Sequence, residues 1–145
     1  MSSDQQKHSV SVAGIVLDPA GRALLIQRRD NSHWEPPGGV LELAESFHHG
    51  LCREVKEETG LDVEPIALTG IYKNMVRGVV ALVFRCAMTG GELSINNEVS
   101  GFHWATPDDV ISMAAEAFAV RVLDALHNGV PTVRQYNGTK ILGDR

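Results

Sequence analysis

The chain has few of the features that mark secreted, disulfide-stapled or membrane-spanning proteins. Its only two cysteines, Cys52 and Cys86, form no CxxC pair, so we expect two buried thiols in a reducing compartment instead of a disulfide or a metal site. No apolar run reaches the roughly 18 residues of a membrane span, and the polar start MSSDQQKHS lacks the apolar segment of a signal peptide. These absences predict a cytoplasmic protein that does not associate with a membrane.

The chain also lacks an excess of basic residues. Its 13 Lys and Arg against 18 Asp and Glu leave a net charge of −5, which argues against bulk binding of nucleic acid or of an anionic membrane. The 6 histidines are scattered without metal-ligand spacing. With 145 residues, 43% apolar and 21% charged, the chain is predicted to be one globular domain over residues 1–145.

Hydrophobic patterning divides the chain into short strands, one central helix and two later helices. After a loose leader at 1–7, strands are predicted at 9–18, 23–27, 40–42, 63–72, 78–87, 99–105 and 132–136, and helices at 46–59, 106–115 and 117–127. Segment 78–87 is nearly all apolar, which predicts a central strand covered on both faces, and 89–91 is predicted to turn. The last helix is expected to carry its apolar face on Phe118, Val122, Leu123 and Leu126. This pattern suits a mixed sheet layered with helices.

The central predicted helix carries three carboxylates on one face. Glu54, Glu57 and Glu58 stand at i, i+3 and i+4 and so fall within an arc of about 100°. Like charges at this spacing weaken an isolated helix, but a cation between them reverses the effect. Mg²⁺ prefers carboxylate oxygens and leaves positions for waters and phosphates, so the spacing predicts a magnesium site for a phosphate-bearing ligand. The alternative is a solvated acidic face compensated by Lys56.

The segments that flank this helix are rich in residues that favour turns. In the run Pro36-Pro37-Gly38-Gly39, the prolines fix φ and the glycines can adopt backbone angles closed to other residues. Such a loop can bring its backbone close to a ligand, and the alternative is a simple tight turn. Ser46 is predicted to cap the start of the helix, and Gly60 to end it in the left-handed conformation.

Residues 39–61 resemble the signature of the Nudix hydrolases position for position. The matching residues are Gly39, Glu45, Arg53, Glu54, Val55, Glu57, Glu58, Gly60 and Leu61. Two unconstrained positions depart from the usual residues, Ala44 for Gly and Gly50 for Ala, and Gly50 is expected to weaken the helix by about 0.5–1 kcal/mol. The resemblance implies an α/β fold, a Nudix-type α/β/α sandwich with a mixed sheet, in which this segment forms a loop–helix–loop.

The resemblance also implies a metal site. Glu54, Glu57 and Glu58 are expected to bind Mg²⁺, with Mn²⁺ as an alternative, and the carbonyl of Gly38 is a further candidate ligand. Glu54 is in addition a candidate to activate the attacking water. Glu98 matches a place where family members often carry an extra metal-binding or catalytic glutamate, and its alternative is an exposed loop acid.

Arg53 has two interpretations, contact with a phosphate or pairing with Glu45 to orient the glutamates, and the family pattern favours the second. The predicted catalytic set is therefore Arg53, Glu54, Glu57 and Glu98, and the predicted structural set is Gly39, Glu45 and Gly60. Aromatic and basic side chains available to the rest of the substrate are Arg28, Trp34, Tyr72, Lys73 and Arg77, each of which also reads as ordinary surface.

The function implied by the resemblance is Mg²⁺-dependent hydrolysis of a pyrophosphate bond in a nucleoside diphosphate linked to another moiety. A (d)NTP or modified nucleotide is the first candidate substrate, and ADP-ribose or a sugar nucleotide is the alternative, because no downstream marker of a family subgroup is found. A non-catalytic nucleotide-sensing module is a second alternative, and isomerisation of an isoprenoid diphosphate, which would call for a cysteine beside the cleft, is a third. The partner is thus a small nucleotide-linked molecule, and the resemblance implies a homodimer.

Overall fold

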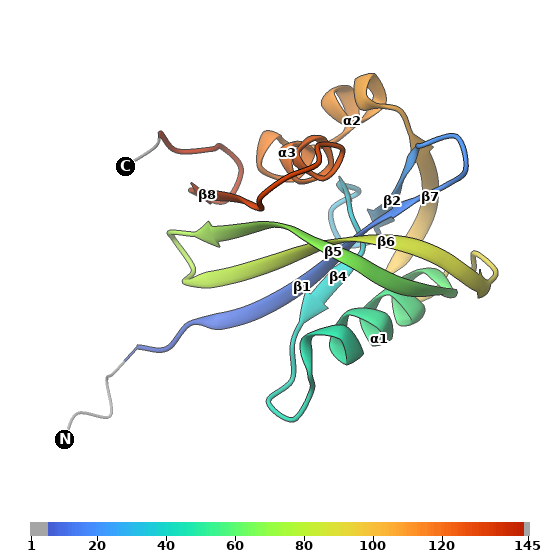
Figure 1. The fold of residues 1–145 in the computed structure, drawn as a ribbon, viewed down its shortest axis with the longest axis horizontal. Helices are drawn as coiled ribbons and strands as arrows, with labels where there is room; N and C mark the ends of the chain where they lie inside the picture. Colours follow the sequence, from blue (N-terminus) through green and yellow to red (C-terminus); the bar gives the residue numbers. More distant parts are fainter. Residues whose placement is uncertain (1–5, 144–145) are drawn as a thin grey trace.

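The computed structural model describes residues 6–143, and its strands form one mixed sheet between helices (Figure 1). The strands are β1 (Ser9–Leu17), β2 (Ala23–Arg28), β3 (Trp34–Glu35), β4 (Gly38–Val40), β5 (Leu61–Asn74), β6 (Val79–Gly91), β7 (Val99–Ala105) and β8 (Thr132–Tyr136). The helices are α1 (Phe47–Thr59), α2 (Pro107–Met113) and α3 (Glu116–Ala125). In Figure 1, α1 lies on one side of the sheet and α2 and α3 on the other, which confirms the predicted α/β/α sandwich. Residues 1–5 of the predicted leader lie outside the described residues.

The centre of the sheet is the parallel pair of β1 and β6. The strand order is β3-β2-β1-β6-β5-β8, with β4 also pairing with β1 and β7 with β2. The register of the central pair runs from Ser9 opposite Val79 to Leu17 opposite Ala87. The apolar segment predicted to be central is therefore central. None of the helices in residues 6–143 is long and apolar enough to cross a membrane.

Alternation along β1 supplies both layers of the core. Val12 and Val16 belong to the core cluster under α1, whereas Ala13 and Ile15 belong to the cluster under α3. All four are at most 5% exposed. Burial of one such Val or Ile side chain stabilises the fold by about 1.5–3 kcal/mol, so the two-sided strand holds both helical layers in place. Both cysteines are free thiols on the α1 side, Cys86 buried and Cys52 half-buried.

The helix ends follow the predicted capping residues. Ser46 Oγ accepts a hydrogen bond from the His49 N–H at 3.2 Å, and Gly60 closes α1 with φ of +85°. Thr106 and Asp109 form a capping box at the start of α2. Because each cap needs only residues within one turn, these boundaries could be read from the sequence.

Several boundaries that depend on pairing between strands were predicted wrongly. β4 lies at Gly38–Val40 instead of 40–42, because its glycines pair with β1, and β3 was not predicted at all. Residues 89–91 do not turn but extend β6 opposite Leu61 and Asp62. α2 ends at Met113, before the predicted 115. The differences in the strands follow from hydrogen bonds to strands that are distant in the sequence.

The apolar face predicted for the last helix is correct at Val122 and wrong at Leu126. The buried side chains of α3 include Ala117, Arg121, Val122 and Ala125, whereas Leu126, just beyond its end, is 38% exposed. Small alanines allow the helix to approach the sheet closely. The orientation of α3 thus places Arg121 in the interior, which hydrophobic periodicity could not indicate.

Tyr72 was predicted to be available for stacking on a base, and this prediction is wrong. Its side chain is fully buried under α3, and its hydroxyl donates a hydrogen bond to Asp124 Oδ2 at 2.6 Å. Arg134 donates two further hydrogen bonds to the same carboxylate, both at 2.9 Å. Tyr72 thus joins a buried polar network that connects β5, α3 and β8.

We expect Asp124 to make the fold sensitive to acid. Burial raises the pKa of Asp124, but hydrogen bonds from Arg134 and Tyr72 outweigh it, and the net pKa lies below 3.8. Because the folded pKa is below the unfolded one, the ionised carboxylate stabilises the fold above the unfolded pKa and loses that contribution as the pH falls through the folded pKa. Urea unfolding should therefore show that Asp124→Asn lowers the free energy of unfolding at pH 7 more than at about pH 3. A loss of equal size at both pH values would contradict this role.

Candidate functional site

Four glutamates from two separate segments line one cavity. Glu54, Glu57 and Glu58 come from α1, and Glu98 comes from the loop that precedes β7. With Asn96 and Asn97 they enclose about 290 Å³, which we name the carboxylate cavity. The structure therefore brings the three acids of α1 together with Glu98, although Glu98 lies far from them in the sequence.

Asn96, which was not predicted, ties the Glu98 loop to the end of α1. Its Nδ2 donates hydrogen bonds to the main-chain carbonyls of Glu57 and Glu58 at 3.3 and 3.0 Å. Its Oδ1 accepts from the N–H groups of Glu98 and Val99 at 2.9 and 3.0 Å. The last carbonyls of a helix have no partner within it, so one side chain satisfies two of them and directs Glu98. An Asn two residues before the acid is the sequence signal of such a turn.

Arg53 holds the acidic face of α1 together. Its guanidinium forms a two-point pair with Glu45, from Nε to Oε2 at 2.5 Å and from Nη2 to Oε1 at 2.8 Å. Its Nη1 also donates to Glu54 at 3.1 Å and to Glu57 at 3.2 Å. The hydrogen bonds that Glu45 accepts, first from Arg53 and then from the Glu42 N–H, lower the pKa of Glu45 to about 2. The pairing of Arg53 with Glu45 is thus present in the structure, and through it one cation bridges three carboxylates.

Glu58 is the most enclosed of the four acids. Its side chain is buried, and its Oε1 accepts a hydrogen bond from the Gly38 N–H at 2.7 Å. Burial raises the pKa of Glu58 to about 8, reinforced by the charges of Glu54, Glu35 and Glu98 and opposed by the Gly38 N–H. Burial raises the pKa of Glu54 as well, although Arg53 opposes it. The cavity thus holds four carboxylates, of which Arg53 pairs with only Glu54 and Glu57 among the described residues.

The residues of the carboxylate cavity fit a hard divalent cation. Within residues 6–143 no three acidic, His or Cys side chains already stand in ligand geometry. Carboxylate oxygens are nevertheless the donors that Mg²⁺ prefers, and one or two of them suffice beside waters and substrate phosphates. Glu57 is 59% exposed and so free to turn toward an ion. For Gly38 the structure shows an N–H directed at Glu58, and ligation by its carbonyl stays a prediction.

Gly38 and Gly39 are needed for space and not for unusual backbone angles, so the reason given from the sequence is wrong. Neither has a positive φ. A Cβ on Gly39 would lie 2.4 Å from Glu54 Oε2, and one on Gly38 would lie 2.4 Å from the Val12 carbonyl oxygen. Gly50 likewise makes room, because its Cβ would meet Leu41 at 2.4 Å. β4 is therefore pressed between β1 and the acidic face of α1.

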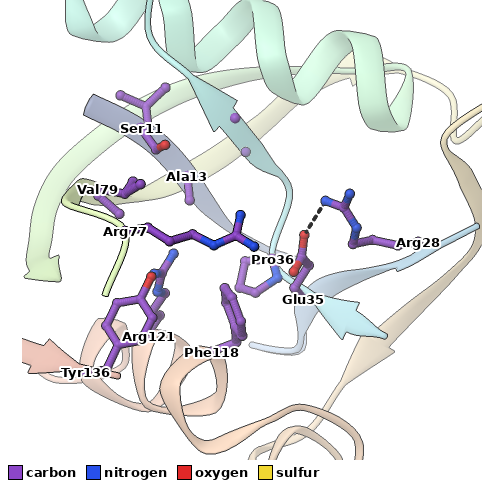
Figure 2. Close-up of a pocket in the computed structure, with 14 residues that line it drawn as sticks. Ser11, Ala13, Arg28, Glu35, Pro36, Arg77, Val79, Phe118, Arg121 and Tyr136 are labelled. Carbon is purple, nitrogen blue, oxygen red and sulfur yellow. Dashed lines mark hydrogen bonds and ion pairs between the residues drawn. The ribbon is translucent and has the colours of Figure 1, made fainter. Parts of the chain in front are cut away.

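A second pocket, of about 310 Å³, borders the same Gly38–Gly39 loop and is shown in Figure 2. We name it the arginine pocket because Arg28, Arg77 and Arg121 line it. Arg28 and Arg77 were predicted to meet substrate, whereas Arg121 and Phe118 were not. In Figure 2 the guanidinium of Arg77 extends into the pocket, and Arg28 lies across it, paired with Glu35.

The other predicted substrate residues lie elsewhere. Lys73 lines a different pocket, beside His8 and Met75, which Arg77 also borders. Trp34 packs edge-on against His103, with ring centroids 6.3 Å apart, and against the core under α3. Tyr72 is buried, as described above. Of the five candidates, the structure thus brings only Arg28 and Arg77 to the arginine pocket.

Comparison with known proteins agrees with this geometry. A family model described as NUDIX domain matches residues 7–126. A "MutT-like protein" of Streptomyces ambofaciens is 52% identical over 93% of this chain and 88% of its own length. A "Putative 8-oxo-dGTP diphosphatase" of Bacillus subtilis is 32% identical over 64% of this chain and 63% of its own length. An ADP-ribose pyrophosphatase of Streptococcus suis, at 24% identity, shares the fold with a TM-score of 0.73, covering 90% of this chain and all of that one.

Proposed function

The chain belongs to the Nudix family and is a Nudix pyrophosphohydrolase, and from this premise we propose that it hydrolyses a (d)NTP or a modified nucleotide with the help of Mg²⁺. More generally, the substrate is a nucleoside diphosphate linked to another moiety. The observation that carries the proposal is the carboxylate cavity, in which Glu54, Glu57 and Glu58 meet Glu98 beside a glycine loop. The Bacillus subtilis relative, described as a putative 8-oxo-dGTP diphosphatase, supports a nucleotide substrate.

The side chains of the cavity take separate roles in this proposal. Glu57, Glu58 and Glu98 would hold the cation, with Glu54 as a further ligand. The bound ion supplies charge neutralisation on the phosphate oxygens and lowers the pKa of a bound water. Glu54 would accept the proton of the water that attacks phosphorus, while Arg53 Nη1, at 3.1 Å, holds its Oε1 in place. The bond to the bridging oxygen then breaks, and the leaving phosphate departs.

Two other functions stay open for the same site. ADP-ribose or a sugar nucleotide has the same pyrophosphate, and the likeness to the Streptococcus suis enzyme supports the fold alone at 24% identity. A non-catalytic nucleotide sensor would have no need of the complete set of glutamates or of the Arg53 pairs. We therefore favour hydrolysis over sensing.

The proposal predicts turnover that depends on a divalent ion. We expect release of phosphate or pyrophosphate from one class among dNTPs, 8-oxo-dGTP, ADP-ribose, UDP-sugars and diadenosine polyphosphates when Mg²⁺ is present. Addition of EDTA should abolish the release, and Mg²⁺ in excess should restore it. Tight nucleotide binding without turnover of any of them would instead support the sensor.

A further inference from the structure

Arg121 is a buried cation without a hydrogen-bond partner at one of its nitrogens. The residue is only 5% exposed. Within residues 6–143 its Nη2 donates to the Tyr136 hydroxyl at 3.0 Å, and its Nε has no partner. The guanidinium stands 4.8–5.5 Å from the ring centroids of Phe118, Tyr72 and Tyr136. Aromatic faces attract a cation, but they leave its charge uncompensated.

Two carboxylates of the surrounding elements, Glu35 and Asp124, are already engaged by other arginines. Glu35 pairs with Arg28 at 3.2 Å, and Asp124 pairs with Arg134 at 2.9 Å. Burial lowers the pKa of Arg121, against the smaller opposing effects of Tyr136, Tyr72 and Glu35. A buried charge is normally paired, because its removal from water costs several kcal/mol. The lack of an ion-pair partner for Arg121 among the described residues therefore calls for an explanation.

Arg77 adds a second cation without a partner. Among the described residues its side chain forms no ion pair or hydrogen bond, and only its backbone N–H is engaged, by Asn74. Figure 2 shows its guanidinium in the same pocket as Arg121, which lies beside Tyr136. Because Glu35 neutralises Arg28, the pocket keeps two uncompensated positive charges in a chain whose net charge is −5.

We propose that the arginine pocket binds a phosphate monoester of the substrate, separate from the pyrophosphate that is hydrolysed. A phosphate monoester carries about −1.5 to −2 charges at pH 7, which matches two guanidinium groups. Its oxygens accept the forked hydrogen bonds that arginine presents, whereas a neutral nucleobase would leave both charges uncompensated. The inference rests on the proposed function for its substrate class: nucleoside diphosphate derivatives with an additional phosphate, on the ribose or on the other moiety.

Binding in EDTA, without a metal ion, tests this inference apart from catalysis. We would titrate the protein with adenosine 3′-monophosphate, adenosine 2′-monophosphate and adenosine, and with ribose 5-phosphate and ribose. The first three report a phosphate on the ribose, and the last two report one on the other moiety. We expect at least one phosphorylated probe to bind about tenfold or more tightly than its counterpart, as charge-assisted hydrogen bonds predict.

The same gain should disappear in Arg121→Met and in Arg77→Met. Arg22→Met is the matched control, because it removes an arginine that pairs with Asp18 away from the pocket and should keep the gain. If circular dichroism shows that Arg121→Met does not fold, the exposed Arg77 still decides the matter. A gain that survives the loss of Arg77 would overturn the inference. So would the absence of a gain for every probe, or an equal loss of adenosine and adenosine monophosphate binding in the variants.

The two proposals fail in different ways. If the phosphate gain is present but no substrate is hydrolysed with Mg²⁺, the proposed function is wrong and the pocket stands. If nucleotides without an extra phosphate are hydrolysed and no gain is seen, this inference is wrong and the proposed function stands.

Discussion

Replacement of Glu57 by glutamine is expected to lower kcat for pyrophosphate hydrolysis by about 10²-fold or more and to leave the fold intact. The amide keeps the size of the side chain but removes a negative charge from the carboxylate cavity. The Glu57 side chain is 59% exposed, and its one ion pair within residues 6–143 is with Arg53, so the free energy of unfolding should change by less than about 0.5 kcal/mol. Glu57 is therefore the cleanest of the four acids to test.

Three measurements separate a loss of metal binding from a loss of structure. Steady-state kinetics at increasing Mg²⁺ would show whether a higher concentration partly restores the variant, as a lost ligand predicts. Urea unfolding would show that stability is unchanged. Glu64→Gln, an exposed acid on β5 away from the cavity, should keep full activity. Wild-type turnover in Glu57→Gln would show that this carboxylate neither binds the ion nor takes part in the reaction.

Alanine at Gly39 and alanine at Gly38 are expected to damage the protein in different ways. At Gly39 the new Cβ meets the Glu54 carboxylate, which must move, and a displacement of about 1 Å at a reacting group can cost about 10²-fold in rate. At Gly38 the new Cβ meets the backbone of β1, at 2.4 Å from the Val12 oxygen and 2.7 Å from the Ala13 Cα. The sheet cannot give way easily there, so the free energy of unfolding should fall by about 1–3 kcal/mol.

The contrast between these two glycines is the test. Gly39→Ala should retain most of its stability and lose activity, whereas Gly38→Ala should show a lower denaturation midpoint. Gly90→Ala is the matched control, because its Cβ would lie 3.4 Å from its nearest neighbour, an ordinary contact. Full activity in Gly39→Ala would mean that Glu54 is mobile enough to be replaced at no cost, and it would remove the support for Glu54 as the proton acceptor.

The acidic helix is the part of the site that the sequence predicts best. Glu54, Glu57 and Glu58 share a face because of helix geometry alone, and Ser46 and Gly60 bound the helix through local hydrogen bonds. The Arg53–Glu45 pair spans only eight residues. All of this lies within one segment, so helix geometry predicted the shared acidic face, and the resemblance to the family pattern favoured the pairing of Arg53 with Glu45.

The arginine pocket could not be predicted in the same way. Tyr72 was named from the sequence as a candidate to contact the substrate, yet its hydroxyl meets Asp124, 52 residues later in the chain. Arg121 was not singled out from the sequence, yet it is enclosed by rings from β5, α3 and β8. These contacts depend on strand register and on the rotation of α3, which no single segment encodes.

The sequence by itself predicted the acidic helix, because the acids, their arginine and the flanking glycines lie within one continuous stretch, and the resemblance of that stretch to the Nudix signature implied the class of reaction. It also indicated the layered α/β fold. Only the tertiary structure decided which cations line the arginine pocket, which aromatic residue is buried, and how Glu98 reaches the helix through Asn96. The physical reason is that side chains from distant segments meet only after sheet pairing and helix packing have positioned them, and small changes in register or rotation change the partners.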